Sequence, residues 1–137
     1  MRSPRTCSQL LRKNISPDKL WYFDIFFLLP KTQIDLKNWK GNLKNSGFLP
    51  DERAWLTNLF DRVGYVDVYR KLEPEASEAC YTWWSNRGQA YAKNVGWRID
   101  YHLATPGIAA SALTTSVYKE ERFSDHAPLI VDYDWSV

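Results

Sequence analysis

An aspartate and a histidine stand side by side in the run Ser124-Asp125-His126-Ala127-Pro128, directly ahead of an apolar stretch. Histidine changes its charge near neutral pH and suits general acid or base catalysis, and a carboxylate is a ligand that Mg²⁺ prefers. By itself the pair fits two interpretations: a catalytic site at the end of a strand, or a turn with a capping Asp125 and a surface His126.

A second acidic residue, Asp100, lies within Trp97–Ala104, whose alternating pattern predicts a strand. One face of that strand would carry Ile99, Tyr101 and Leu103, and the other Arg98, Asp100 and His102. An acid in a strand is disfavoured unless it is paired or functional. If the strands that hold Asp100 and His126 are neighbours, Asp100 can orient the His126 ring, as carboxylates do in catalytic sites. Two alternatives stay open: a solvent-facing Asp100, and His102 as the partner in place of His126.

Two stretches of the chain are rich in basic residues. Residues 31–44 hold four lysines and a single acid, Asp35, and Asn86–Arg98 holds no acid at all. The second stretch combines Arg87, Lys93 and Arg98 with Asn86 and Asn94, and it is flanked or interrupted by Trp83, Trp84, Tyr91 and Trp97. Cations neutralise phosphates, amides hydrogen-bond phosphate oxygens, and aromatic faces stack on bases or sugars. The combination favours contact with nucleic acid over a solvated loop whose tryptophans turn into the core.

Composition limits the setting of such a site. The chain has 137 residues, the size of one domain, and a net charge of only +2, so charge distribution matters more than its total. Two cysteines make neither a disulfide framework nor a zinc motif, which fits a reduced, cytoplasmic protein. The apolar run Leu20–Pro30 is eleven residues long, too short to span a bilayer as a helix, so no membrane partner is expected.

The elements that must position these residues form a mixed α and β pattern. Pro50, with Asp51 and Glu52 after it, predicts a helix that ends near Gly64 and buries one apolar face. That face would consist of Trp55, Leu56, Leu59, Phe60 and Val63. Strands are predicted at Trp21–Leu29, Val66–Tyr69, Tyr81–Ser85, Trp97–Ala104, Thr114–Tyr118 and Leu129–Tyr133, with a polar loop at Asp35–Gly47. The order indicates one layer of a sheet sandwich with a helix packed outside it.

Five segments in this order and spacing carry a resemblance to a known family. They are Asp35–Asn42, Ser46–Arg53, Tyr81–Trp84, Asn94–Tyr101 and Ser124–Pro128. Together they resemble the exonuclease III and AP endonuclease family, from about Gln33 to about Trp135. The resemblance implies an α/β (α+β) fold, here the C-terminal half of a four-layered α/β sandwich of two packed sheets with outer helices. It also implies hydrolysis of DNA at abasic sites and 3′ ends with Mg²⁺ or Mn²⁺.

The resemblance assigns a role to each residue that matches a motif. His126 resembles the catalytic histidine at the scissile phosphate, Asp100 the acid that orients it, and Asp125 a metal-site carboxylate. The wall of the pocket for a flipped-out abasic sugar is matched by Trp83, Trp97 and Ile99. The loop Asn86–Val95 resembles one that presses into double-stranded DNA, and DNA contacts are expected from Asn86, Arg87, Lys93, Asn94 and Arg98.

The chain also departs from the family pattern. Ahead of Ile34 the family has further site residues, including a metal-binding Glu and a Gly-Asp-aromatic-Asn motif, whereas this chain reads Phe26-Phe27-Leu28-Leu29-Pro30-Lys31-Thr32-Gln33. Asp24 has the wrong neighbours and distance to take a role. We therefore expect a truncated or frame-shifted chain, with residues 1–32 unrelated to the family and residues 33–137 a partial domain. Such a half-sandwich would expose apolar surface, which predicts self-association or pairing with a complementing N-terminal half.

Three functions fit these observations: a DNA-repair phosphodiesterase, a catalytically inactive DNA-binding remnant of that enzyme, and a phosphatase or lipid phosphodiesterase on the same fold. The Asn94–Tyr101 and Tyr81–Trp84 segments favour DNA repair over the third. Metal-dependent cleavage separates the first from the second.

Overall fold

The computed structural model describes residues 30–134. The strand expected at Trp21–Leu29, and all of the segment 1–32 except its last three residues, lie outside these described residues. Helices are α1 (Pro50–Asp61), α2 (Val68–Leu72) and α3 (Pro106–Ala110), and strands are β1 (Val66–Asp67), β2 (Leu103–Ala104), β3 (Ala112–Val117) and β4 (Leu129–Tyr133). Short 3-10 turns occur at Gln33–Asp35, Trp39–Asn42 and Glu78–Cys80.

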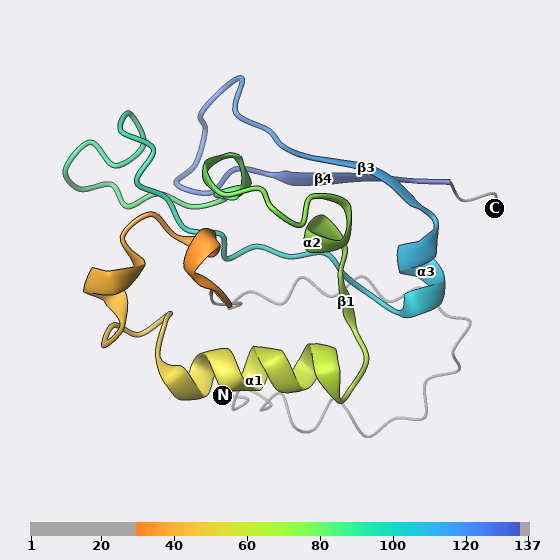
Figure 1. Cartoon of the computed structure of the whole chain (residues 1–137). Helices are drawn as coiled ribbons and strands as arrows, with labels where there is room; N and C mark the ends of the chain where they lie inside the picture. Colours follow the sequence, from red (N-terminus) through yellow and green to blue (C-terminus); the bar gives the residue numbers. More distant parts are fainter. Residues whose placement is uncertain (1–29, 135–137) are drawn as a thin grey trace, which may run out of the picture.

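The strands pair as two small antiparallel sheets, β1 with β2 and β3 with β4. Figure 1 shows α1 along one side of the molecule and the β3–β4 pair along the other, with α2 and β1 between them. Strand β3 leads the chain toward the loop that carries Asp125 and His126, and β4 leads it away from that loop again. None of the helices between residues 30 and 134 combines the length and apolar character needed to cross a bilayer.

Helix α1 begins where the sequence predicts it. Pro50 occupies the first turn, and the Glu52 carboxylate accepts the backbone N–H groups of Gly47 and Leu49, each at 2.8 Å. Leu56 is fully buried and packs with Tyr101, and Leu59 and Phe60 lie against that cluster. The expected apolar face is too wide, however, because Trp55 and Val63 are exposed (46% and 55%).

Two of the predicted strands are largely absent from the described residues. In Tyr81–Ser85 and Trp97–Ala104 the only regular strand is β2. The two segments meet at an isolated bridge between Trp83 and Trp97, and a second isolated bridge joins Trp83 to His126. Some of the backbone N–H groups that would pair with a neighbouring strand in a sheet donate to side chains instead. One of these is Thr82 Oγ1, which accepts the N–H groups of Ile99 and Asp100.

The other strand predictions hold in part. The strand predicted at Val66–Tyr69 stops at Asp67, whose carboxylate accepts the N–H of Arg70 and caps α2. The strand predicted at Thr114–Tyr118 begins earlier, at Ala112, and the one at Leu129–Tyr133 is confirmed.

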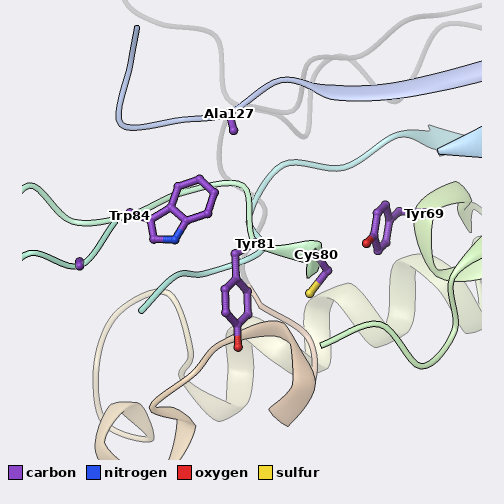
Figure 2. Packing of buried hydrophobic residues seen from close by; sticks show 6 residues of the cluster. Tyr69, Cys80, Tyr81, Trp84 and Ala127 are labelled. Atoms are coloured by element: carbon purple, nitrogen blue, oxygen red, sulfur yellow. The ribbon is translucent and has the colours of Figure 1, made fainter. Parts of the chain in front are cut away.

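The largest cluster of buried apolar side chains supports the loops of the candidate site. It joins Tyr69, Cys80, Tyr81, Trp84, Ala90 and Ala127 (Figure 2). Ala127 follows His126 directly, and Tyr81 and Trp84 flank the Thr82–Trp83 pair. Burial of these side chains therefore fixes both segments from which the site is built.

Gly96 lies against this cluster so closely that no side chain fits. A Cβ at Gly96 would lie 2.6 Å from Trp84 Nε1 and 2.7 Å from Tyr81 Cβ. We expect Gly96→Ala to lower the free energy of unfolding by about 1–3 kcal/mol, the usual cost of overpacking. Gly41→Ala is the matched control, because nothing lies within 4 Å of a Cβ there. Urea unfolding of both variants measures the difference, and equal losses would contradict the packing described here.

A network of buried charges holds the N-terminal part of the described chain to the rest. Arg98 is 1% exposed and Asp35 is fully buried. The Arg98 guanidinium donates to Asp35 Oδ1 at 2.7 Å and, through two nitrogens, to both carboxylate oxygens of Asp67 at 3.1 and 2.7 Å. Arg70 adds a second hydrogen bond to Asp35 Oδ1, also at 2.7 Å. Geometry of this kind repays part of the cost of removing charges from water.

This network makes folding sensitive to acid. Burial by itself would raise the pKa of Asp35, but Arg98 and Arg70 outweigh burial and hold it below its ordinary value of 3.8. A carboxyl whose pKa is lower in the folded state stabilises the fold fully above its unfolded pKa and loses that contribution as pH falls through the folded pKa. We therefore expect the free energy of unfolding to fall as the pH drops below 3.8. Unfolding curves across that range, with Asp35→Asn flattening the dependence, provide the check.

Candidate active site

The structure brings Asp100 and His126 together. His126 Nδ1 lies 2.9 Å from Asp100 Oδ2 and 3.2 Å from Oδ1, and both side chains are 40% exposed. A carboxylate beside Nδ1 keeps a proton on that nitrogen, which leaves Nε2 as the ring atom that can exchange a proton or hydrogen bond with a substrate. The pairing expected from the sequence is therefore present, although Asp100 reaches it from an irregular segment and not from a strand.

His102 does not take this place. Its Nε2 lies 3.3 Å from the carbonyl oxygen of Leu129, and its ring stacks on Tyr133 at 6.4 Å. These contacts tie the segment before β2 to β4. His102 therefore has structural partners of its own, and the alternative in which it pairs with Asp100 is not what the structure shows.

The Asp100–His126 pair opens into a cavity of about 290 Å³. Its other walls include Tyr101, Phe123 and Leu129. Phe123 is 69% exposed, although it stands three residues before the histidine. The sequence alone does not indicate Phe123, because a single Phe within a charged loop carries no pattern that distinguishes it from a core residue.

Asp125 lies beside the pair and keeps its charge. Its Oδ2 accepts the indole N–H of Trp83 at 3.1 Å, and Ser124 Oγ lies 3.3 Å from Oδ1. The hydrogen bond from Trp83 is the main reason that the pKa of Asp125 is lowered from its ordinary value. A charged carboxylate with remaining lone pairs is a suitable ligand for a hard cation.

Residues 30–134 do not assemble a complete metal site. Within them no group of three or more His, Cys, Asp or Glu side chains is placed to hold an ion. Asp125 fits as one carboxylate ligand, and Mg²⁺ is commonly held by one or two carboxylates together with water and substrate phosphate. The chemistry of the donor is thus suitable, but further protein ligands would have to come from elsewhere.

The residues expected to hold an abasic sugar form a separate group. Trp83 and Trp97 pack edge to face, with ring centroids 6.1 Å apart, and both are half-buried. Ile99 is also half-buried. None of the three lines the cavity at Asp100 and His126. The structure therefore places them close to Asp125, through the Trp83 indole, but does not show them as walls of one pocket with the catalytic pair.

Some side chains of the loop expected to contact DNA are exposed, and one is hydrogen-bonded within the protein. Asn86, Arg87 and Lys93 are exposed. Asn94 instead uses its side chain within the protein, where Oδ1 accepts the Trp84 indole N–H and Nδ2 donates to the Glu78 carbonyl, each at 3.1 Å. The amide of Asn94 is therefore committed to holding the loop.

The expected DNA contact from Arg98 requires correction. The alternating pattern placed Arg98 on the same face as Asp100, but the segment is not a strand and the Arg98 side chain is buried. Its nitrogens are bound to Asp35 and Asp67, and its guanidinium lies 4.1 Å from the centre of the Tyr101 ring. Arg98 is thus a core residue in this structure and cannot reach a phosphate without unfolding its surroundings.

Arg122 is a surface residue that the sequence reasoning did not single out. It donates to Asn86 Oδ1 at 3.0 Å, lies 4.6 Å from the centre of the Tyr91 ring, and donates to the Ser124 carbonyl at 3.3 Å. Arg122 therefore links the Asn86–Val95 loop to the segment that carries His126. Its proximity to Phe123 was visible in the sequence, but its partners were not.

Comparison with known proteins agrees with this geometry. Residues 19–126 match the family model described as "Endonuclease/Exonuclease/phosphatase family". The chain belongs to this family. The match begins ahead of residue 33, where a boundary was expected, and the separate origin of residues 1–32 stays a prediction.

Curated relatives of this chain are named as a DNA repair nuclease, an endonuclease for apurinic or apyrimidinic sites and an exodeoxyribonuclease. The chain is 40% identical over 97 residues to "DNA repair nuclease APEX1" of Danio rerio, covering 71% of this chain and 31% of that protein. It is 36% identical over 126 residues to a DNA-(apurinic or apyrimidinic site) endonuclease of Dictyostelium discoideum, covering 91% and 34%. It is 38% identical over 97 residues to an exodeoxyribonuclease of Bacillus subtilis, covering 71% and 38%. The chain thus spans about a third of the length of these relatives.

Solved structures of the family share the fold. An AP endonuclease from Archaeoglobus fulgidus matches with a TM-score of 0.72 at 28% identity, covering 78% of this chain and 42% of that one. A 3′-5′ exonuclease from Neisseria meningitidis matches with a TM-score of 0.71 at 32% identity and the same coverage. The expected fold class, part of an α/β sandwich of the AP endonuclease type, is confirmed.

Proposed function

We propose that this chain carries the acid–base and DNA-contacting part of a DNA-repair phosphodiesterase that hydrolyses DNA at abasic sites and 3′ ends. The observation that carries the proposal is the Asp100–His126 pair, which lies in a cavity beside the charged Asp125. Phosphodiester hydrolysis needs stabilisation of charge on the phosphate, and proton transfer at the attacking or leaving oxygen. The names of the curated relatives support the same reaction.

Each residue then has a defined task. Asp100 holds the His126 ring through Nδ1, and Nε2 serves the phosphate as hydrogen-bond donor or proton carrier. Asp125 is the proposed ligand of a divalent ion, Mg²⁺ or Mn²⁺, which supplies charge stabilisation when bound. Divalent-metal dependence is general in this family of nucleases.

Double-stranded DNA is the proposed partner, with its phosphates met by the exposed part of the loop. Asn86, Arg87 and Lys93 are available for that contact. Trp83, Trp97 and Ile99 are proposed to meet the abasic sugar, with Asn94 holding the loop in place. Self-association, or pairing with a complementing N-terminal half, is a further prediction that sizing of the purified chain would test.

A second function is favoured by one observation. Because residues 30–134 hold no group of three or more side chains placed to bind a metal ion, a DNA-binding remnant without catalysis is the alternative. Such a remnant would bind DNA in a salt-dependent manner and would leave it uncut.

The deciding experiment uses an end-labelled duplex with one abasic site, and an intact duplex as its control. We expect the full chain to cut beside the abasic site with Mg²⁺ or Mn²⁺ and not with EDTA, and His126→Ala to abolish the cut. Binding without cutting would establish the remnant. Absence of both binding and cutting would overturn the two proposals together.

A further inference from the structure

Thr82 is a buried polar residue at the point where the two segments of the candidate site meet. Its side chain is fully buried. The hydroxyl oxygen accepts two backbone N–H groups, from Ile99 and from Asp100, each at 3.1 Å. Because residues 99 and 100 lie outside the regular strands, these two hydrogen bonds replace part of what a sheet would have provided.

The backbone of Thr82 binds the segment that carries the other half of the pair. Its carbonyl oxygen accepts the N–H of Ala127 at 2.7 Å, and Ala127 is the residue after His126. Its own N–H donates to the Trp97 carbonyl at 3.0 Å. One residue therefore fixes the backbone on both sides of the Asp100–His126 hydrogen bond.

We propose that Thr82 is the positioning residue of the Asp100–His126 pair: its hydroxyl binds the backbone of Asp100, and its carbonyl binds the backbone of Ala127, the residue after His126. Hydrogen bonds weaken quickly with distance and misalignment, and misplacement by about 1 Å is costly at a reacting centre. Both members of the pair are 40% exposed, so burial alone does not lock them. The importance of this for catalysis rests on the proposed function, whereas the positioning itself does not.

Two substitutions separate the hydroxyl from the shape of the side chain. Thr82→Val keeps the volume and removes the acceptor, whereas Thr82→Ser keeps the acceptor and removes a methyl group. We expect the amide protons of Ile99 and Asp100 to exchange with solvent about tenfold faster in Thr82→Val than in Thr82→Ser, the change that one lost hydrogen bond produces. Nuclear magnetic resonance of the ¹⁵N-labelled full chain measures both amides.

The ring of His126 gives an independent signature. The chain has two histidines, so its imidazole N–H signals are readily assigned. We expect a slowly exchanging His126 Nδ1–H signal in the wild type and in Thr82→Ser, and its loss in Thr82→Val and in the reference variant Asp100→Asn. A Thr82→Val variant that folds and keeps this signal, with unchanged amide exchange, would overturn the proposal. Fast exchange of the Ile99 and Asp100 amides in the wild type would also overturn the proposal. This second test needs no variant, so it decides the question even if Thr82→Val does not fold.

Cleavage assays then connect positioning to catalysis. In a cleaving chain, Thr82→Val should lower kcat by roughly tenfold to a hundredfold with little change in KM, the range typical of groups that orient a functional histidine, and Thr82→Ser should restore it. If the wild type does not cut DNA, the proposed function fails while the magnetic resonance result still decides the role of Thr82.

Discussion

Replacement of Asp100 by asparagine should lower the rate of abasic-site cleavage by about 10²–10⁴-fold. The carboxylate lies 2.9 Å from His126 Nδ1 and holds the proton on that nitrogen. An amide of the same size keeps the shape but removes the charge, and it can present an N–H that favours the wrong tautomer. The loss should appear in kcat, because Asp100 orients a catalytic group and is not proposed to bind DNA.

The control must show that the fold and the DNA-binding surface survive. Asp132→Asn alters an exposed carboxylate on β4 and should leave cleavage unchanged. Salt-dependent binding of the abasic duplex should be the same in both variants. If Asp100→Asn cuts at the wild-type rate, the pair seen in the structure does not perform the proposed chemistry.

The pairing of Asp100 with His126 is one of the alternatives that the residues leave open and the one that the resemblance implies, whereas the route of the chain to it could not be predicted. Alternation in Trp97–Ala104 predicts a strand, and Asp100 would meet His126 if that strand and the strand after His126 were neighbours. Within this segment the structure forms a strand only at Leu103–Ala104, and the backbone of Asp100 is held by a hydrogen bond to Thr82. A side-chain hydroxyl that replaces a backbone partner leaves no periodic signal in the sequence.

The sequence also could not predict which of the basic residues are buried. Arg87, Lys93 and Arg98 look alike when only their charge and neighbours are read. The partners that bury Arg98 are distant in the chain: Asp35 is 63 residues away and Asp67 is 31 residues away. Local composition predicts where cations gather, whereas tertiary structure decides which of them is enclosed by carboxylates.

Loss of Arg98 should therefore act on folding and not on DNA contact. Arg98→Met removes the principal partner of the fully buried Asp35 and the Arg98 hydrogen bonds to both oxygens of Asp67. Breaking a buried ion pair from one side typically costs about 3–5 kcal/mol, because the remaining charge stays in a poorly solvated place. Since a small domain is stable by only about 5–15 kcal/mol, this single change should shift unfolding to much lower urea concentration.

Arg87→Met is the matched control, because Arg87 is exposed in the Asn86–Val95 loop. It should change the free energy of unfolding by less than about 0.5 kcal/mol, as exposed substitutions usually do, while it weakens DNA binding. The two variants should therefore have different effects. Arg98→Met should lower the free energy of unfolding, and Arg87→Met should lower the affinity for DNA at unchanged stability. If Arg98→Met were as stable as the wild type and bound DNA more weakly, the structural role proposed for Arg98 would be wrong. Arg98 would then be a DNA-contacting residue, as its charge and its neighbours in the sequence predict.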